Sequence, residues 1–342
     1  MSEFKYTMAD FKSDQEVKWC PGCGDYAVLN AVQRAMPEIA EINKVTHDRF
    51  AVISGIGCSS RFPYYVNTFG FHGIHGRAMA IATGVKVANP RLSTMVTTGD
   101  GDSLAIGGNH FIHAVRRNID INVVLFNNEI YGLTKGQYSP TSKFGKVTKT
   151  SPFGTVEQPF APGELVIGAR GTFFARSIDA EVNLTKDCLT EAAKHDGMSV
   201  VEVLVNCVIF NNNTHAAFAG DKNLRTERTI TLRHGEKMLF GVNNEMGLMM
   251  DGLKLKVVKV GENGVTLDDI LTHDAHEKDT MLHVMLASMK YPDYPVALGV
   301  IRKVAEPTYE KAVEMQIEEV QAESKIKCMD DLLRSGETWE VK

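Results

Sequence analysis

Two apolar segments near the centre of the chain each end in small or polar residues. Residues 93–98 have the composition of a buried strand and are followed by Gly-Asp-Gly-Asp at residues 99–102, and residues 121–126 are followed by Asn-Asn at residues 127–128. The stretch between them carries apolar residues at helical spacing. Two strands joined by a helix run parallel, so both polar ends should meet at the carboxyl edge of one sheet, where open α/β folds bind ligands.

The residue types at these two strand ends suit a diphosphate and a divalent cation. Glycines on both sides of Asp100 allow backbone N–H groups to approach a phosphate closely. Asp100 and Asn128 offer oxygen ligands of the kind that Mg²⁺ prefers. The order of Gly-Asp-Gly, a gap of under thirty residues and Asn-Asn resembles the thiamine-diphosphate motif. A tight turn that merely contains an acid is the alternative for the first triplet taken alone.

Composition limits the classes of protein to which the chain can belong. Its 342 residues can form one large or two small domains, and 44% hydrophobic with 23% charged residues is usual for a soluble globular protein. A net charge of −5 argues against nucleic acid or an anionic membrane as the main partner. No apolar run is long enough to cross a membrane, and the first residues lack the apolar core of a signal peptide. We therefore expect a cytoplasmic protein.

The expected architecture is a doubly wound parallel α/β sheet with helices on both faces. Asp25 should cap a helix whose apolar stripe ends near Ile39, and His75 should open a second helix rich in alanine. Strands are expected at residues 50–54, 93–98, 121–126, 171–178 and 199–207, with a further short strand near 255–260. Residues 138–170 form a predicted long loop, and loops of that length usually serve a function.

Four segments are expected along the chain. Residues 1–18 would form a polar arm, and residues 19–215 would form the domain that binds ligands. Residues 216–305 would continue that domain with less regular structure. Residues 306–342 are rich in charge and would form a C-terminal tail that packs on a partner subunit.

Four of the six cysteines are expected at turns or strand ends that meet at one edge of the sheet: Cys20, Cys23, Cys58 and Cys207. Four thiolates of this kind suit a tetrahedral zinc ion or a [4Fe–4S] cluster, and spacing alone does not separate the two. A cluster beside thiamine diphosphate could accept electrons one at a time, whereas zinc has no redox chemistry, so we expect iron and sulfur. Cys188 and Cys328 are interpreted as ordinary thiols.

Five segments together resemble one protein family. They are WCPGCGD, SGIGCSSR, GFHGIHGRAMAIATGVKVANP, GDGDSLAIGGNHFIHA and NNEIYGLTKGQYSPTS. They are similar to the β subunit of 2-oxoacid:ferredoxin oxidoreductases, and most like the 2-oxoglutarate:ferredoxin oxidoreductase (KorB-type) branch. The resemblance is close over residues 15–215 and looser beyond them. It implies that residues 19–215 bind thiamine diphosphate, Mg²⁺ and one [4Fe–4S] cluster.

The resemblance also implies roles for individual residues. The cluster ligands would be Cys20, Cys23, Cys58 and Cys207. Mg²⁺ would be bound by Asp100, Asn128 and the backbone carbonyl of Ile130. The cofactor would be lined by Ile56, Gly57, Cys58, Ser59, His75, Gly99, Gly101, Asp102, Gly132, Leu133 and Thr134. The catalytic residues on the substrate side would be Leu133, Lys135 and Arg61, the last of which stands where many relatives have lysine.

The implied activity is the oxidative decarboxylation of 2-oxoglutarate with coenzyme A to succinyl-CoA, CO₂ and reduced ferredoxin, or the reverse. Thiamine diphosphate would carry the carbanion chemistry, while the protein supplies placement and electrostatics. The family places the glutamate that activates thiamine on the α subunit, and this chain has no obvious candidate for it. We therefore expect an active site at the interface with an α or fused γα subunit, an (αβ)₂ assembly, and no activity from this chain alone.

Three alternatives remain open from the sequence. The same chemistry could act on pyruvate or on a branched or aromatic 2-oxoacid. A non-oxidative thiamine-diphosphate decarboxylase could carry structural zinc at its cysteines. A non-enzymatic electron-transfer subunit could bind a cluster only, in which case Asp100→Ala would leave activity intact.

Overall fold

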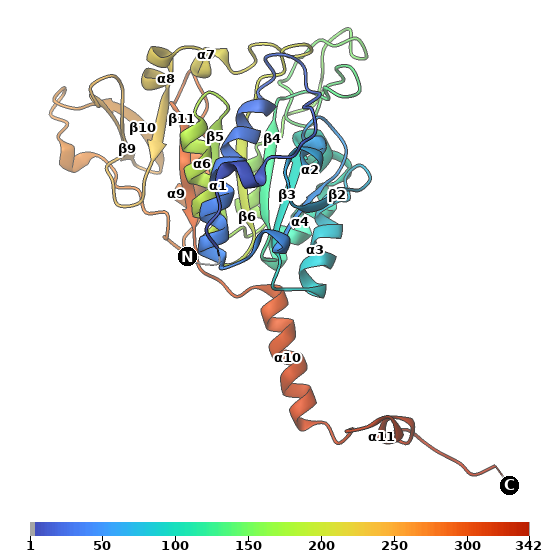
Figure 1. Cartoon of the computed structure of the whole chain (residues 1–342). Helices are drawn as coiled ribbons and strands as arrows, with labels where there is room; N and C mark the ends of the chain where they lie inside the picture. The colour runs from blue at the N-terminus through green and yellow to red at the C-terminus, as the bar shows by residue number, and fades with distance from the viewer. Residues whose placement is uncertain (1–3, 342) are drawn as a thin grey trace.

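The computed structural model describes residues 4–341, and its centre is a sheet with helices on both faces (Figure 1). Within these residues the sheet has eight strands in the order β2-β1-β3-β4-β6-β5-β11-β7. They are β1 (Phe50–Ser54), β2 (Phe69–His72), β3 (Ser93–Gly99), β4 (Asn122–Asn127), β5 (Phe173–Ile178), β6 (Ser199–Leu204), β7 (Thr229–Leu232) and β11 (Val296–Lys303). Neighbouring strands are parallel, except that β11 pairs antiparallel with β5. The expected doubly wound α/β fold is confirmed.

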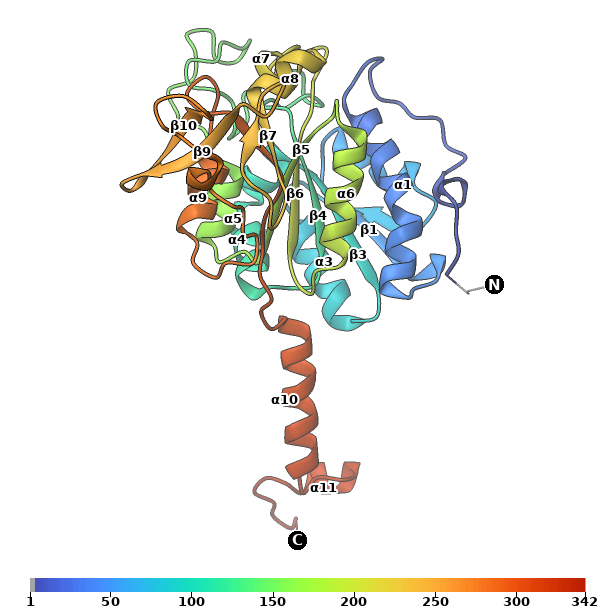
Figure 2. The ribbon, with the colours of Figure 1, turned by 90° about the vertical axis from the view of Figure 1, so that its left-hand side faces the viewer.

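Each face of the sheet has its own layer of helices (Figure 2). One layer contains α1 (Asp25–Asn43) and α6 (Val182–Ala193). The other contains α3 (Ala78–Ala88), α4 (Gly108–Arg117), α5 (Pro162–Gly168) and α9 (Met281–Ser288). The buried side chains accordingly form two large hydrophobic cores, one on each side of the strands. Burial of both faces is the usual state of a parallel sheet.

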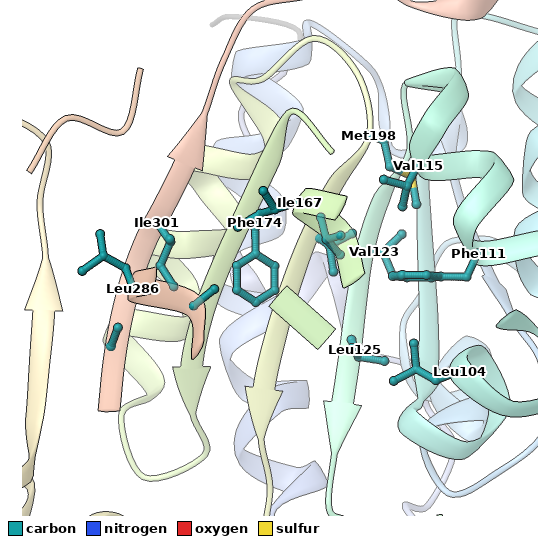
Figure 3. Close-up of a cluster of buried hydrophobic side chains, with 14 of the residues drawn as sticks. Leu104, Phe111, Val115, Val123, Leu125, Ile167, Phe174, Met198, Leu286 and Ile301 are labelled. Carbon is teal, nitrogen blue, oxygen red and sulfur yellow. The ribbon is translucent and has the colours of Figure 1, made fainter. Parts of the chain in front are cut away.

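Successive side chains of β4 enter opposite cores, because side chains alternate along a strand. Val123 and Leu125 pack with Phe111 in the core on the side of α4 (Figure 3). Val124 and Phe126 pack in the core on the side of α1. Both faces of the strand are therefore buried, which explains why its sequence is continuously apolar.

The sequence does not predict three strands of the main sheet: β2, β7 and β11. β2 is a short edge strand that is exposed along its length, so its sequence carries no burial pattern. Gly70 allows it to approach β1, because a Cβ there would lie 2.3 Å from the carbonyl oxygen of Val52. β7 and β11 lie within residues 216–305, which were expected to be less regular, and they join that segment to the same sheet.

The start of α1 differs from the expected one. Gly24 occupies the N-cap position and Asp25 is the first helical residue, so the prediction that Asp25 caps the helix is wrong. The carboxyl group of Asp25 is buried at the edge of the cavity described below. The expected loop at residues 138–170 is irregular except for α5.

The remaining elements are short or lie outside the main sheet. A small antiparallel sheet contains β8 (Leu239–Phe240), β9 (Met246–Asp251) and β10 (Lys254–Lys259), and β10 corresponds to the strand expected near 255–260. The short helices are α2 (Phe62–Tyr65), α7 (Ala216–Ala219) and α8 (Lys222–Arg228). Single 3₁₀ turns are η1 (Met8–Phe11), η2 (His47–Arg49), η3 (Ser59–Arg61) and η5 (Leu267–Asp269), and η4 (Asp102–Ile106) is a π-helical turn.

The two ends of the chain behave differently. Phe11 is fully buried, so the described part of the N-terminal arm packs on this chain's own body. At the other end, α10 (Tyr309–Glu323) and α11 (Met329–Leu333) extend away from the body (Figures 1 and 2). Within residues 4–341 no helix is long and apolar enough to cross a membrane.

Candidate active site

A cavity of about 460 Å³ opens at the carboxyl ends of β1, β3 and β4. Small-molecule sites usually have volumes of about 300–1,000 Å³. β1 and β3 are neighbours whose connections lead to opposite sides, and such a switch point is where open α/β sheets bind ligands. The structure brings every predicted cofactor contact into this wall: Ile56, Gly57, Cys58, Ser59, His75, Gly99, Gly101, Asp102, Gly132, Leu133 and Thr134. The predicted Mg²⁺ ligands also line it: Asp100, Asn128 and Ile130.

The turn after β3 depends on glycine. A Cβ at Gly101 would lie 2.2 Å from the ring of Tyr131, so only glycine lets the two segments come this close. The Tyr131 hydroxyl donates a hydrogen bond of 2.9 Å to the carbonyl oxygen of Gly101. Burial and the nearby carboxylates of Asp100 and Asp102 raise the pKa of Tyr131 to about 12. The turn after β3 and the loop after β4 are thereby held together across the cavity.

Asp100 is the most deeply placed acid of this turn and is only 2% exposed. Burial raises the pKa of its carboxyl group to about 6. The hydroxyls of Ser139 and Thr141 both lie within hydrogen-bonding distance of its Oδ2 atom. These two residues come from the long loop for which a function was expected. A cation bound beside Asp100 would stabilise the ionised carboxylate, which burial deprives of hydration by water.

The loop after β4 presents further oxygen atoms. The Asn128 side-chain oxygen accepts a hydrogen bond of 3.1 Å from the backbone N–H of Ile130, which closes a tight turn around Glu129. Glu129 has a φ of 54°, in the left-handed region. The side chain of Asn211 donates to the carbonyl oxygen of Asn128 at 2.9 Å. The turn keeps Asn128 and Ile130 on the same cavity wall as Asp100.

The second acid of the turn, Asp102, anchors two other segments. Its Oδ1 atom accepts hydrogen bonds from the Nδ1 atom of His75 at 2.8 Å, from the Gly76 backbone at 2.8 Å and from the Ile56 backbone at 3.1 Å. Its Oδ2 atom accepts one from the Thr98 hydroxyl at 2.8 Å. Asp102 therefore fixes the orientation of His75 and of the loop after β1, and it contributes to the cavity partly through them.

Ser59 provides a direct test of whether a polar ligand fits. Its hydroxyl oxygen is buried, lines the cavity and has no hydrogen-bond partner among residues 4–341. A buried hydroxyl without a partner costs free energy of about 1–3 kcal/mol, so it usually marks a place for a ligand or water. Together with the buried carboxylate of Asp100 and the oxygens of Asn128 and Ile130, it matches a diphosphate with an oxygen-coordinated cation.

The four predicted cluster ligands lie at one corner beside this cavity. A Cβ built on Gly132 would lie 3.5 Å from the Cys58 sulfur and 3.6 Å from the Cys207 sulfur. Burial raises the pKa of the Cys23 thiol, with contributions from Asp25, Cys58 and Cys207. Burial also raises the pKa of Cys58 to about 12, and Asp25, Cys207 and Cys20 add to that shift. All four sulfurs are therefore close enough to interact.

Zinc and an iron–sulfur cluster hold four cysteines in different ways. Within residues 4–341 no group of three or more His, Cys, Asp or Glu side chains is arranged to hold one metal ion. Zinc draws its four sulfurs onto one centre through bonds of about 2.3 Å. A [4Fe–4S] cluster instead distributes its cysteine ligands over four irons.

The three predicted substrate residues differ in their relation to the cavity. Leu133 lines the cavity and is 45% exposed. Lys135 lies two residues further on an exposed turn with a φ of 77°, and it does not belong to the cavity wall. Arg61 lies in η3, also outside that wall. The roles of Arg61, Leu133 and Lys135 in substrate recognition stay predictions.

Sequence reasoning missed four residues of the cavity wall: Asp25, Phe126, Tyr131 and Gln137. Asp25 is 2% exposed, and burial raises the pKa of its carboxyl group to about 7. The available signal was its position directly after Cys-x-x-Cys-Gly. That signal points away from a site, because an acid at the start of a helix is more often a cap. The backbone of Gln137 accepts a hydrogen bond of 2.9 Å from the Tyr131 N–H, which closes the loop that carries Leu133.

Comparison with known proteins agrees with this geometry. Residues 55–203 match the family model of the C-terminal thiamine-pyrophosphate-binding domain of thiamine pyrophosphate enzymes. These residues contain the turn after β3 and the loop after β4, and they therefore include the wall of the cavity on the Asp100 side. The expected thiamine-diphosphate-binding fold is confirmed.

Relatives extend the match over nearly the whole chain. The 2-oxoglutarate oxidoreductase subunit KorB of Mycobacterium tuberculosis is 46% identical over 97% of this chain and 88% of its own length. The β subunit of 2-oxoacid:ferredoxin oxidoreductase 1 of Aeropyrum pernix is 42% identical over 64% of this chain and 68% of its own. A solved structure of 2-oxoglutarate:ferredoxin oxidoreductase from Magnetococcus marinus, with 2-oxoglutarate, coenzyme A and succinyl-CoA bound, covers 97% of both chains at 30% identity and a TM-score of 0.76. Motifs, cavity and relatives agree, and the chain belongs to the family of 2-oxoacid:ferredoxin oxidoreductase β subunits.

Proposed function

We propose that this chain is the β subunit of a 2-oxoglutarate:ferredoxin oxidoreductase. With an α partner it catalyses the oxidative decarboxylation of 2-oxoglutarate with coenzyme A to succinyl-CoA and CO₂, with reduction of ferredoxin, or the reverse reaction. The observation that carries the proposal is one cavity that joins the Gly-Asp-Gly turn, the Asn-Asn loop and the cysteine corner. The names of the relatives support the choice of 2-oxoglutarate.

Thiamine diphosphate and Mg²⁺ are proposed to occupy the inner part of the cavity. Asp100, Asn128 and the carbonyl oxygen of Ile130 would hold the cation, because all three line the same wall and present oxygen. Ser59 and His75 would contact the polar groups of the cofactor. When bound, thiamine diphosphate supplies the stabilisation of a carbanion that the reaction needs, while these residues orient it and keep water away.

A [4Fe–4S] cluster is proposed at the cysteine corner. Its ligands would be Cys20, Cys23, Cys58 and Cys207, which lie at one corner and influence one another's pKa. Cys58 also lines the cofactor cavity, so a cluster there would stand next to the reacting centre. Such a position suits the transfer of single electrons from the site towards ferredoxin.

An α subunit is proposed to cover the open side of the site. Large apolar side chains that are 45% exposed or more lie on the segments around the cavity: Tyr64, Phe69, Ile74, Ile106 and Leu133. Apolar side chains gathered in this way mark protein interfaces more often than free surface. The charged tail of residues 306–341, which leaves the body, is proposed to reach a subunit of the same assembly, for which we propose (αβ)₂. Cytoplasmic residence is proposed with it.

Substrate choice is tested with the complete complex. The chain is co-expressed with its α partner, and reduction of ferredoxin is followed with coenzyme A and, in turn, 2-oxoglutarate, pyruvate and a branched 2-oxoacid. The proposal expects the highest kcat/KM for 2-oxoglutarate. Equal values for all three acids, or no turnover of 2-oxoglutarate, would overturn the assignment.

The identity of the metal at the cysteine corner is tested separately. Iron and acid-labile sulfide in the anaerobically purified complex should be present in equal amounts, with a broad visible absorption band. A colourless complex that contains zinc instead would favour the non-oxidative thiamine enzyme and reject the redox assignment.

A further inference from the structure

A row of buried polar side chains runs under the Asp100 site across three neighbouring strands. Arg176 on β5 is opposite Glu202 on β6 in the strand register, and Asn127 ends β4 on the other side of β6. The next member of the row is Thr141, which belongs to the long loop at residues 138–170. Arg176 is 6% exposed, Glu202 1%, and Asn127 and Thr141 5% each. None of the motifs identified in the sequence includes Arg176 or Glu202.

Hydrogen bonds join these side chains into one chain that ends at Asp100. The Nε–H of Arg176 donates to Oε2 of Glu202 at 2.7 Å. The Nδ2 group of Asn127 donates to Oε1 of Glu202 at 2.8 Å. The Thr141 hydroxyl, which has one hydrogen to donate, lies between two acceptors: Oδ1 of Asn127 at 2.9 Å and Oδ2 of Asp100.

The direction of these hydrogen bonds fixes the orientation of the Asn127 side-chain amide. An ionised Glu202 only accepts hydrogen bonds, so the amide of Asn127 must present nitrogen to it and oxygen to Thr141. Without the carboxylate, the backbone N–H of Glu129 would still donate to Oδ1 of Asn127, but at a long 3.4 Å. The amide could then rotate by half a turn, and Thr141 would face a donor. Glu202 thus determines what Thr141 meets on the side opposite Asp100.

Packing alone does not hold this part of the site. A second cavity of about 250 Å³ lies behind the row and is lined by Asn127, Thr141, Arg176 and Glu202. The row therefore forms part of the wall between this space and the surroundings of Asp100. Because the wall has empty space behind it, hydrogen bonds rather than close packing must keep its side chains in place.

Stability alone does not account for the charged pair. A buried ion pair often contributes no more stability than apolar residues of the same volume, whereas removal of one partner costs about 3–5 kcal/mol. Arg176 also donates to the carbonyl oxygen of Ala287 on α9 at 3.1 Å, so its position is fixed from the opposite side. The Arg176–Glu202 pair is therefore suited to holding the neighbouring side chain of Asn127 in one orientation.

We propose that Glu202, held by Arg176, is a positioning residue for the Mg²⁺ ligand Asp100 and acts on it through Asn127 and Thr141. The inference rests on the proposed metal site at Asp100. Residues that orient a metal ligand typically change metal affinity or activity by about 10- to 100-fold when they are replaced.

The test uses the purified complex with its α partner and Mn²⁺ as the probe in place of Mg²⁺. Free Mn²⁺ is measured by electron paramagnetic resonance at a fixed concentration of thiamine diphosphate, and Tm is measured on the same samples. The variants are Glu202→Gln, Arg176→Lys and Thr141→Val. Each should raise the Kd for Mn²⁺ by about 10-fold or more.

A matched control separates orientation from general loss of stability. Arg302 on β11 is also an arginine that is 7% exposed, and it donates to the carbonyl oxygens of Gly171 and Glu277 at 3.0 Å. Arg302→Lys should lower Tm as Arg176→Lys does and leave the Kd for Mn²⁺ unchanged. An equal rise of the Kd in Arg302→Lys and Arg176→Lys would mean a structural role only and would overturn the inference.

Two further variants complete the test. The double variant Glu202→Gln/Thr141→Val should bind Mn²⁺ no more weakly than the weaker single variant, because both changes interrupt one connection. Additive losses would contradict the proposed route and would reject it even if Arg176→Lys folds poorly.

Asp100→Asn distinguishes failure of the metal site from failure of the positioning role. Unchanged Mn²⁺ binding there rejects the metal site itself, whereas lost binding there with normal binding in Glu202→Gln rejects only the positioning role.

Discussion

The inner and outer parts of the candidate active site are built in opposite ways. The inner part, which we name the cofactor floor, contains Asp100 and Asp102; both are almost fully buried, and both accept several hydrogen bonds from this chain. The outer part, named the substrate rim, contains Leu133 and Lys135, which are exposed. The two parts lie fewer than forty residues apart in the sequence.

The difference shows which half of the site this chain completes by itself. The floor is preorganised, so it can bind a cofactor without large rearrangement. The rim has open space on its outer side, so its contacts depend on what another subunit adds. Exposed loops also accept sequence changes more easily than buried turns. We therefore expect substrate preference to vary with the rim more than with the floor.

Replacement of Cys58 should give the largest effect, because Cys58 belongs to both the cofactor cavity and the cysteine corner. In the complex, Cys58→Ser should abolish reduction of ferredoxin and lower the iron content. Cys188→Ser is the matched control, since Cys188 is a buried cysteine in α6 away from the site. A Cys58→Ser complex with full iron content and turnover would reject the cluster assignment.

A methyl group on the floor should have the next largest effect. In Gly101→Ala the new Cβ would lie 2.2 Å from the Tyr131 ring, so the loop after β4 must move. We expect thiamine diphosphate to bind about 10- to 100-fold more weakly in a fluorescence titration of the complex.

Gly84→Ala is the control for that change. Gly84 lies inside α3 and has open space around its Cβ position, so alanine there should stabilise the protein by about 0.4–1 kcal/mol and leave cofactor binding as it is. If both glycine variants bind thiamine diphosphate normally, the close approach of the two segments does not shape the floor.

At the rim, Lys135→Ala should affect substrate and leave the cofactor in place. Because Lys135 is predicted to face the 2-oxoacid, loss of its positive charge should raise KM by about 10-fold, equivalent to about 1.4 kcal/mol, with little change of kcat. Steady-state kinetics of the complex over a range of 2-oxoglutarate concentrations measures this. A fall in kcat with constant KM would place Lys135 in the chemistry of the floor instead.

Replacement of His195 should have the smallest effect on activity. His195 lies outside the cavity and forms a hydrogen bond of 2.8 Å with the Thr172 hydroxyl. Burial, with the charge of Lys303, lowers the pKa of His195 from 6.5 to about 4. The folded state therefore keeps His195 neutral, and its contribution to stability, present above pH 6.5, is lost as the pH falls towards 4. The loss is about 3 kcal/mol in total.

Thermal unfolding of wild type and His195→Gln between pH 7 and pH 4 checks this. Glutamine can still donate to Thr172 but does not titrate, so the variant should lose less of its Tm in acid. Bound thiamine diphosphate should be equal in both proteins at pH 7. An identical acid dependence of Tm would show that other groups control it.

The sequence predicted those parts of the molecule whose residues follow a local rule. β1 and β4 are largely apolar, and β3 combines Met and Val with small hydroxyl side chains, because both faces of these strands are buried. The turns that follow them carry Gly, Asp and Asn, which favour turns through local interactions. The cavity wall was therefore largely predictable. β2 was not, because an exposed edge strand has no burial pattern.

Side chains that depend on distant partners could not be predicted. Arg176 and Glu202 each look like a surface charge within an apolar strand, and only the order of β4, β6 and β5 brings them together beside Asn127. Asp25 likewise looks like a helix cap, and only the fold places it against the cavity. Pairing across a sheet is set by tertiary structure, which a single sequence does not reveal directly.

The central claim is that Asp100 on the floor holds thiamine diphosphate and that Lys135 at the rim does not. It is tested most directly by the amount of thiamine diphosphate that remains bound in purified complexes of Asp100→Asn and Lys135→Ala, measured together with wild type in Mg²⁺-containing buffer. The account predicts that Lys135→Ala retains as much cofactor as wild type and that Asp100→Asn retains almost none. Equal cofactor content in the two variants would contradict it.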